Sequence, residues 1–288
     1  MKKIYRSQLF KISSLNSLSI ILKIGIGLVT SKLLAVFVGP SGMALVGNLR
    51  NFMTSVESVS TLGFQNGIVK YVAEIKEDKP SLQKLLSTVF ICLVFVAILL
   101  SGVLFFFAAF WNQEIFGNKY QYKSVFKALA LALPWYVVSI FLISVLNGLG
   151  SFKRVIWTNS IGNAIGLLVS IVLILQYRTF GALLAIVVSP ALLFFFSFYF
   201  VNKEIDIFKS ISRSAFDLKI IKSMSSYSLM ALVSSVLGPL IFLAIRNNII
   251  QTLGYSQAGY WETMMRISTY YMLFASTILT VYFLPKLA

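Results

Sequence analysis

Long apolar runs alternate with short polar segments along the whole chain of 288 residues. A helix needs about 20 mostly apolar residues to cross the hydrocarbon core of a bilayer. The pattern predicts eight membrane-spanning helices, over residues 12–38, 42–69, 84–110, 125–147, 156–176, 180–201, 224–251 and 257–284. We therefore expect an all-α integral membrane protein. Hydropathy alone supports the second span, 42–69, least well.

Composition supports the membrane assignment and excludes several classes of protein. Hydrophobic residues make up 58% of the chain and charged residues 12%, whereas soluble domains carry roughly a quarter charged residues. The chain has one cysteine, Cys92, and no histidine, so an internal disulfide, a Cys/His zinc site and a Ser-His-Asp triad cannot form. We expect no enzyme activity, catalytic residue, metal or cofactor.

Lysine and arginine are divided unevenly between the two sets of polar segments. Sixteen lie in the segments 1–11, 70–84, 153–154 and 203–222 and at 286, and only four lie in 119–127 and at 178. Basic residues gather on the cytoplasmic side of a membrane protein, so we expect a cytoplasmic N-terminus. The basic segments 1–11 and 70–84 lie on the same side only if the chain crosses the membrane twice between them, so this assignment requires a span at 42–69. The net charge of +16 thus indicates orientation, and without a nucleic-acid-binding motif we expect no nucleic-acid partner.

A weak internal repeat predicts how the spans are grouped. Residues 39–50 read GPSGMALVGNLR and residues 254–266 read GYSQAGYWETMMR, so the first two spans resemble the last two. Repeats of this kind are common in transporters, with the substrate site between the halves. We expect a six-helix lobe over 1–201, a cytoplasmic connector over 202–223, and the first two helices of a second lobe over 224–288. The chain would then be an N-terminal portion of a twelve-helix, two-lobed transporter; the alternative is a complete eight-span protein.

Seven charged side chains lie at least five residues inside the predicted spans, where a charge is costly and usually functional. They are Lys23, Lys32, Arg50, Glu57, Arg246, Glu262 and Arg266. Helical spacing gives spans one, two, seven and eight one polar stripe each. The simplest packing places Arg50, Arg266, Lys23 and Arg246 around one water-accessible cavity, where arginine suits an anionic, phosphate-bearing head group.

The remaining charged residues have other predicted roles. Glu57 and Glu262 are candidates for ion coupling or charge balance, and Lys32 is expected to reach the membrane surface. Two alternatives stay open: the polar stripes only mediate helix packing, or Glu262 and Arg266, four residues apart, only neutralise each other. Gly238 and Pro239 lie mid-span and predict a hinge, or else a static bend.

Four short motifs resemble a known family of membrane proteins. They are GFQNGIVKYVAE at 63–74, AGYWETMMRIS at 258–268, FLPKLA at 283–288 and GPSGMA at 39–44. These are similar to the Wzx-type flippases of O-antigen and enterobacterial common antigen, within the multidrug/oligosaccharidyl-lipid/polysaccharide exporter superfamily. The resemblance implies about twelve helices in two lobes, within the bacterial inner (plasma) membrane.

The resemblance also implies a substrate and partners. Family members move undecaprenyl-pyrophosphate-linked oligosaccharides from the cytoplasmic to the periplasmic leaflet, and a polysaccharide polymerase and a chain-length regulator are candidate partners beside membrane lipids. The leading hypothesis is therefore a lipid-linked oligosaccharide flippase that works by alternating access. The alternatives are a cation-coupled multidrug antiporter of the same superfamily and a membrane enzyme of polysaccharide assembly. An enzyme is disfavoured because the largest predicted outer loop, 111–124, offers only Glu114, Lys119 and Lys123.

Overall fold

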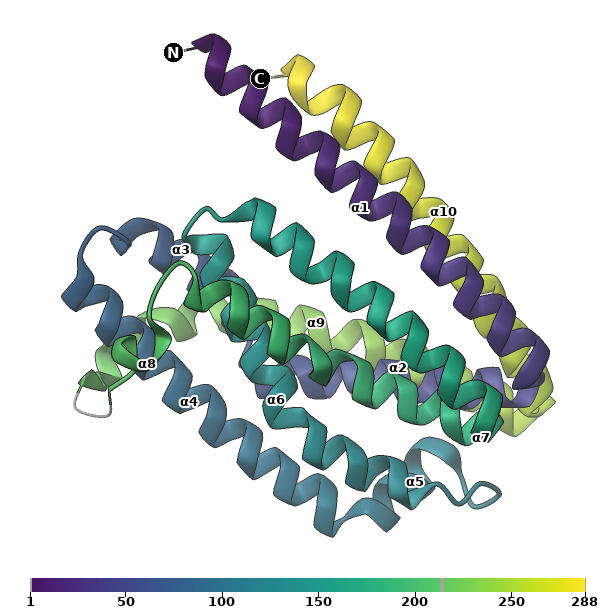
Figure 1. The fold of residues 1–288 in the computed structure, drawn as a ribbon. Coiled ribbons are helices and arrows are strands. Elements are labelled where there is room, and N and C mark those ends of the chain that lie inside the picture. The colour runs from purple at the N-terminus through teal and green to yellow at the C-terminus, as the bar shows by residue number, and fades with distance from the viewer. Residues whose placement is uncertain (1, 213–214, 288) are drawn as a thin grey trace.

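The computed structural model describes residues 2–212 and 215–287, with side chains described except at 2–14, 208–209, 226–227 and 277–287. Every regular element in this part of the chain is a helix (Figure 1). Of the basic residues that predict orientation, Arg213 lies outside the described residues. Those at 2–11 and at 286 are described by their backbone alone.

The helices follow one another with short turns. They are α1 (Lys2–Phe37), α2 (Gly39–Ser60), α3 (Gln65–Ile75), α4 (Lys79–Phe106), α5 (Ala108–Phe116), α6 (Lys123–Gly148), α7 (Phe152–Asn202), α8 (Ile207–Ser210), α9 (Leu218–Leu253) and α10 (Tyr255–Leu287). The long α7 contains two of the predicted spans. The two halves of α7 are separated by a kink at Arg178, whose backbone leaves the helical region with φ 49° and ψ −121°.

The helices confirm the predicted all-α membrane class. Within the described residues, five segments are long and apolar enough to cross a membrane: Leu15–Phe37, Lys79–Phe106, Lys123–Gly148, Phe152–Asn202 and Ser228–Leu253. Each of the eight predicted spans overlaps a helix. The intramembrane charges Arg50 and Glu57 lie on α2, and Glu262 and Arg266 lie on α10; in the described residues, neither helix is among these five segments.

The predicted second span, 42–69, is wrong as a single helix. The helix α2 ends at Ser60, and Leu62 and Gly63 adopt φ of 51° and 66° before α3 begins at Gln65. A β-carbon at Gly63 would lie 2.7 Å from the carbonyl oxygen of Ser228. The break therefore brings α9 against the chain at a point where only glycine leaves enough space.

The core of the bundle forms around α6. In the most apolar stretch of α6, 56% of the residues are buried inside the protein. The corresponding share is 22% or less in the other four candidate membrane-spanning segments. Its side chains Phe126 and Phe141 are fully buried: Phe126 packs against Phe52 of α2 and Phe116 of α5, and Phe141 packs against Phe90 of α4. Because α6 is enclosed by protein, it fixes the helices that surround the site described below.

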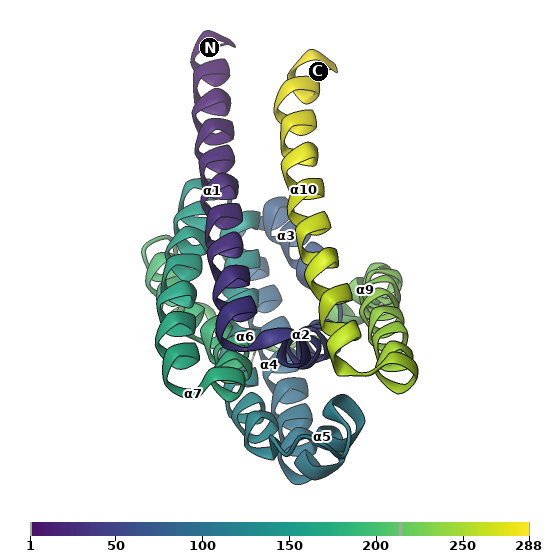
Figure 2. The same ribbon diagram turned by 90° about the vertical axis from the view of Figure 1, so that its right-hand side faces the viewer.

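The two ends of the bundle carry different connections. We call "turn end" the end with residues 38–41, 117–122 and 254–256, where the Tyr255 hydroxyl donates to the Phe116 carbonyl at 2.8 Å. The opposite "connector end" carries 61–64, 149–151 and 203–217. From the turn end, α1 and α10 lean away from the other helices, and both chain ends project beyond the bundle (Figures 1 and 2).

The connector is tied to the start of α4. The backbone N–H of Ser212 donates to the Ser87 hydroxyl, and that of Asp217 to the Thr88 hydroxyl, both at 2.9 Å. Asp217 then caps α9 by accepting the backbone N–H of Lys219. Within the described residues of this segment, a short helix, α8, covers Ile207–Ser210. The connector is thus held against the six-helix region by hydrogen bonds.

The orientation predicted from the basic residues can be tested by labelling. In full-length protein with Cys92→Ala, we expect Gln257→Cys to react with a membrane-impermeant thiol reagent added outside intact cells. Lys203→Cys should react only after the membrane is opened, because it lies at the connector end. Both side chains are exposed. The reverse labelling pattern would contradict a cytoplasmic connector.

Candidate functional site

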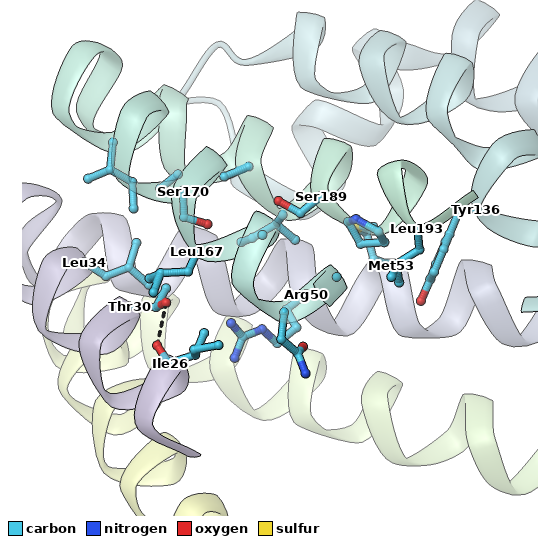
Figure 3. Close-up of a pocket in the computed structure, with 18 of the residues that line it drawn as sticks. Ile26, Thr30, Leu34, Arg50, Met53, Tyr136, Leu167, Ser170, Ser189 and Leu193 are labelled. Atoms are coloured by element: carbon cyan, nitrogen blue, oxygen red, sulfur yellow. Dashed lines mark hydrogen bonds between the residues drawn. The ribbon is translucent and has the colours of Figure 1, made fainter. Parts of the chain in front are cut away.

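A polar cavity of about 400 Å³ lies within the predicted first lobe. Its walls come from α1, α2, α6 and both halves of α7, and Arg50 reaches across it toward α1 (Figure 3). Polar side chains are spread around these walls: Thr30, Arg50, Thr54, Glu57, Tyr136, Asn163, Ser170 and Ser189. The remaining lining residues are apolar or glycine, so the cavity offers several hydrogen-bonding groups inside an apolar bundle.

Arg50 and Glu57 give this cavity its charges. They lie two turns apart on α2 and are both half-buried. The Glu57 carboxylate accepts hydrogen bonds from the Tyr136 hydroxyl at 2.6 Å and from the Gln65 amide at 3.3 Å. Arg50 makes no ion pair within 4.0 Å in the part of the chain that the structure describes. The cavity thus presents an uncompensated guanidinium and a carboxylate bound only by neutral donors.

A second charged group, which we call the buried ion cluster, consists of Arg246, Glu262 and Arg266. Their exposed fractions are 2%, 4% and 4%. Arg246 Nη2 lies 2.5 Å from Glu262 Oε2, and Arg266 Nε lies 2.9 Å from Glu262 Oε1. The Arg246 guanidinium also stacks over the Trp261 ring, 5.2 Å from its centroid. One carboxylate therefore serves two arginines, and the cluster keeps a net charge of +1.

Helix α2 packs directly on this cluster. The Asn48 side chain accepts a hydrogen bond from Arg246 Nη1 at 3.0 Å and donates to Asn247 Oδ1 at 2.9 Å. Gly47, the residue before Asn48, also faces the cluster. A β-carbon at this position would lie 2.5 Å from Glu262 Oε2 and 2.7 Å from Arg246 Cζ. The small residue therefore leaves room for the ion pair between the helices.

The structure corrects the predicted geometry of the site. Arg50 and Glu57 do line a cavity, but its other walls are α6 and α7 instead of α9 and α10. Arg246 and Arg266 are turned into the buried ion cluster, because a buried charge is costly unless a counter-ion accompanies it. Gly47, which packs against Glu262 and Arg246, lies three residues before Arg50 on α2, so the cluster adjoins the cavity.

The remaining predicted residues lie elsewhere. Lys23 is exposed on α1 and does not line the cavity. One turn further on, Gly27 faces the ring of Tyr270 on α10. The helix α9 stays helical through Gly238 and Pro239, so the hinge at these residues remains a prediction.

Sequence reasoning missed two residues of the site. Tyr136 binds Glu57 from 79 positions further along the chain, and nothing local marks that pairing. Asn48 links Arg246 to the backbone carbonyl of Ile115, to which it donates at 2.8 Å. An asparagine inside a span, two residues before an arginine, was a usable signal, because intramembrane polar side chains commonly bind a neighbouring helix.

Close helix packing at the turn end gives a stability prediction. A β-carbon at Gly259 would lie 1.8 Å from the carbonyl oxygen of Pro40, which belongs to the backbone. Because the backbone cannot yield as a flexible side chain does, we expect Gly259→Ala to destabilise the protein by about 1–3 kcal/mol. Thermal unfolding in detergent measures this. Gly25→Ala is the matched control, since it meets nothing within 4 Å, and an equal loss in both variants would contradict the contact.

Comparison with known proteins places the chain in a family. Residues 9–287 match the polysaccharide biosynthesis protein family. The chain belongs to this family. It is 28% identical to the lipid III flippase of Escherichia coli (strain K12), over 97% of this chain and 67% of that protein. These matches confirm the resemblance to the Wzx type.

Solved transporters share the fold. The MATE multidrug transporter DinF-BH, in complex with R6G, aligns with a TM-score of 0.69 at 15% identity, over 95% of this chain and 63% of that one. A MOP superfamily transporter from Pyrococcus furiosus aligns with a TM-score of 0.68 at 16% identity, over 94% and 62%. The chain therefore spans less than two thirds of these transporters. At such identities the likeness concerns the fold alone.

Proposed function

We propose that this protein moves a lipid-linked oligosaccharide across the bacterial inner membrane, from the cytoplasmic to the outer leaflet. The anionic pyrophosphate head group would pass through the bundle by alternating access while the polyprenyl tail stays in the bilayer. The family and the lipid III flippase relative support the substrate class. The observation that carries the proposal is Arg50, an arginine without an ion pair in the described residues, facing a polar cavity.

Physical chemistry favours an anion at this position. A phosphate loses several kcal/mol of hydration free energy when it leaves water, even after the protein relaxes. Arginine recovers part of that loss by donating two parallel hydrogen bonds to phosphate oxygens. Ser170 and Ser189 on α7 add hydroxyl groups to the cavity, and the Ser189 hydroxyl has no hydrogen-bond partner in the described residues. The Thr30 and Thr54 hydroxyls also line it but already donate to the carbonyls of Ile26 and Arg50. The guanidinium and hydroxyls together suit a phosphate better than a cationic drug.

A binding experiment with full-length protein tests the proposal. We expect undecaprenyl pyrophosphate to bind at least tenfold more tightly than undecaprenol, which has the same tail without the phosphates. Native mass spectrometry or a fluorescence displacement assay measures both. Equal binding of the two lipids would show that the phosphates are not recognised. Binding of a cationic dye, together with indifference to the pyrophosphate lipid, would replace the proposal by a multidrug antiporter.

The carboxylates differ in their capacity to couple transport to protons. Glu57 is bound by two neutral donors, so a change in its charge would leave no partner ion unpaired. Protonating Glu262 would instead leave two buried arginines without their counter-ion. In vesicles with full-length protein, we expect Glu57→Gln to remove any dependence of transport on an imposed pH gradient. A dependence that persists in this variant assigns the coupling to another group.

A further inference from the structure

The buried ion cluster joins the two predicted lobes at the turn end of the bundle. Arg246 on α9 and the Glu262–Arg266 pair on α10 belong to the predicted second lobe. Asn48 on α2 belongs to the first lobe and accepts from Arg246, while it donates to the Ile115 carbonyl of α5. Four helices thus meet through one connected set of hydrogen bonds. Any motion that separates the lobes at this end has to break it.

Backbone contacts close the same end around the cluster. The backbone at Gly259 lies against Pro40, and the hydroxyls of Ser41 and Ser256 lie 3.3 Å apart. Both contacts join the α1–α2 turn to the start of α10. Toward the other end, α1 and α10 lean away from the remaining helices (Figures 1 and 2). The protein therefore has its lobes in contact at the turn end in this conformation.

The charges of the cluster suit an attachment that has to open repeatedly. Two arginines share one carboxylate, and the Nη atoms of Arg266 and the Nε of Arg246 are buried without an acceptor among the described residues. Burying these groups costs free energy that offsets much of the ion-pair attraction. Opening to water would hydrate all three nitrogens. The cluster thus has a specific geometry but contributes only a modest net free energy to holding the helices together. A contact that opens and closes repeatedly needs such a small difference between its two states.

We infer that Asn48, Arg246, Glu262 and Arg266 form a latch that holds the lobes closed at the turn end and releases once in each transport cycle. The inference rests on the proposed alternating-access function and deepens it. Glu262 is the centre of the latch, because both arginines bind it. Helix α2 connects the latch to the cavity, because Gly47 packs against Glu262 and Arg246 and lies three residues before Arg50. An anion bound at Arg50 would therefore change the electrostatic balance of the latch.

Disulfide crosslinking measures the latch without any transport assay. In full-length protein with Cys92→Ala, the pair Ser41→Cys and Ser256→Cys should crosslink readily under copper phenanthroline, since their hydroxyls are 3.3 Å apart. Adding Arg246→Gln with Glu262→Gln removes the ion pair and keeps the cluster's net charge at +1. We expect this double substitution to slow crosslinking at least threefold. An unchanged rate would overturn the latch.

Two controls keep the outcome interpretable. The pair Ser19→Cys and Ser160→Cys, whose native hydroxyls are 2.8 Å apart, joins α1 to α7 inside the predicted first lobe. Its rate should not respond to the latch substitutions, and a parallel slowing would indicate general unfolding and overturn the inference. Asn48→Ala, which keeps every charge, should also slow the 41–256 crosslink. Transport that continues in the fully crosslinked 41–256 protein would show that this end does not open.

Discussion

Replacing Arg50 by alanine is expected to lower transport of the lipid-linked glycan at least tenfold. The guanidinium is the positive group that faces the polar cavity, and a hydrogen bond to a charged group contributes about 1.5–3 kcal/mol, where 1.4 kcal/mol corresponds to a factor of ten. Stability should change little, because Arg50 makes no ion pair within 4.0 Å in the described residues. Export by full-length protein in vesicles measures the first effect and thermal unfolding the second.

Two matched variants sharpen the test of Arg50. Arg50→Lys keeps the charge but loses the bidentate geometry that phosphate prefers, so it should recover only part of the transport. Lys32→Ala removes a basic residue from the exposed surface of α1 and should leave transport near the wild-type rate. Normal export by the Arg50→Ala variant would show that the substrate does not depend on this cavity. Equal losses in Arg50→Ala and Lys32→Ala would point to overall charge instead.

Replacing Glu262 by alanine is expected to have the largest effect on stability. The substitution leaves Arg246 and Arg266 buried without a counter-ion, and removing one member of a buried ion pair costs about 3–5 kcal/mol. That is a large part of the roughly 5–15 kcal/mol that holds a typical protein folded. We expect a sharply lower yield of folded protein and a lower midpoint of thermal unfolding in detergent.

Controls separate the loss of charge pairing from the loss of a side chain. Glu114→Ala removes an exposed carboxylate from α5 and should change stability by less than about 0.5 kcal/mol. Combining Arg246→Gln with Glu262→Gln keeps the net charge of the cluster and should restore only part of the folded yield, because Arg266 still lacks its carboxylate partner. If Glu262→Ala is as stable as Glu114→Ala, the cluster does not need its counter-ion, and the latch loses its physical basis.

The sequence by itself determined the membrane class and the approximate positions of the long helices along the chain. Apolar runs separated by polar turns leave few alternatives, because every backbone polar group at membrane depth has to be bonded within a helix. The turns at Gly254 and Arg178 were predicted within a few residues. The repeat around Arg50 and Arg266 and the short motifs pointed to the family that the comparison confirms.

Only the tertiary structure decided which charges meet. Helical spacing put Arg50, Arg246 and Arg266 on polar stripes, but a stripe does not specify which helix it faces. Packing turned two of these arginines onto Glu262 and left Arg50 at the cavity. The close approach that permits this depends on Gly47 and Gly259, whose importance lies in contacts more than 200 positions away along the chain.

The break between α2 and α3 shows the same limit. Residues 61–64 read TLGF and contain no proline or charged residue, so the pattern predicted one helix across them. The positive φ of Leu62 and Gly63 is maintained by α9, whose Ser228 carbonyl lies against Gly63. Hydrophobicity depends on each residue alone and is therefore readable along the chain. Charge pairing and helix breaks depend on neighbours that only folding brings together.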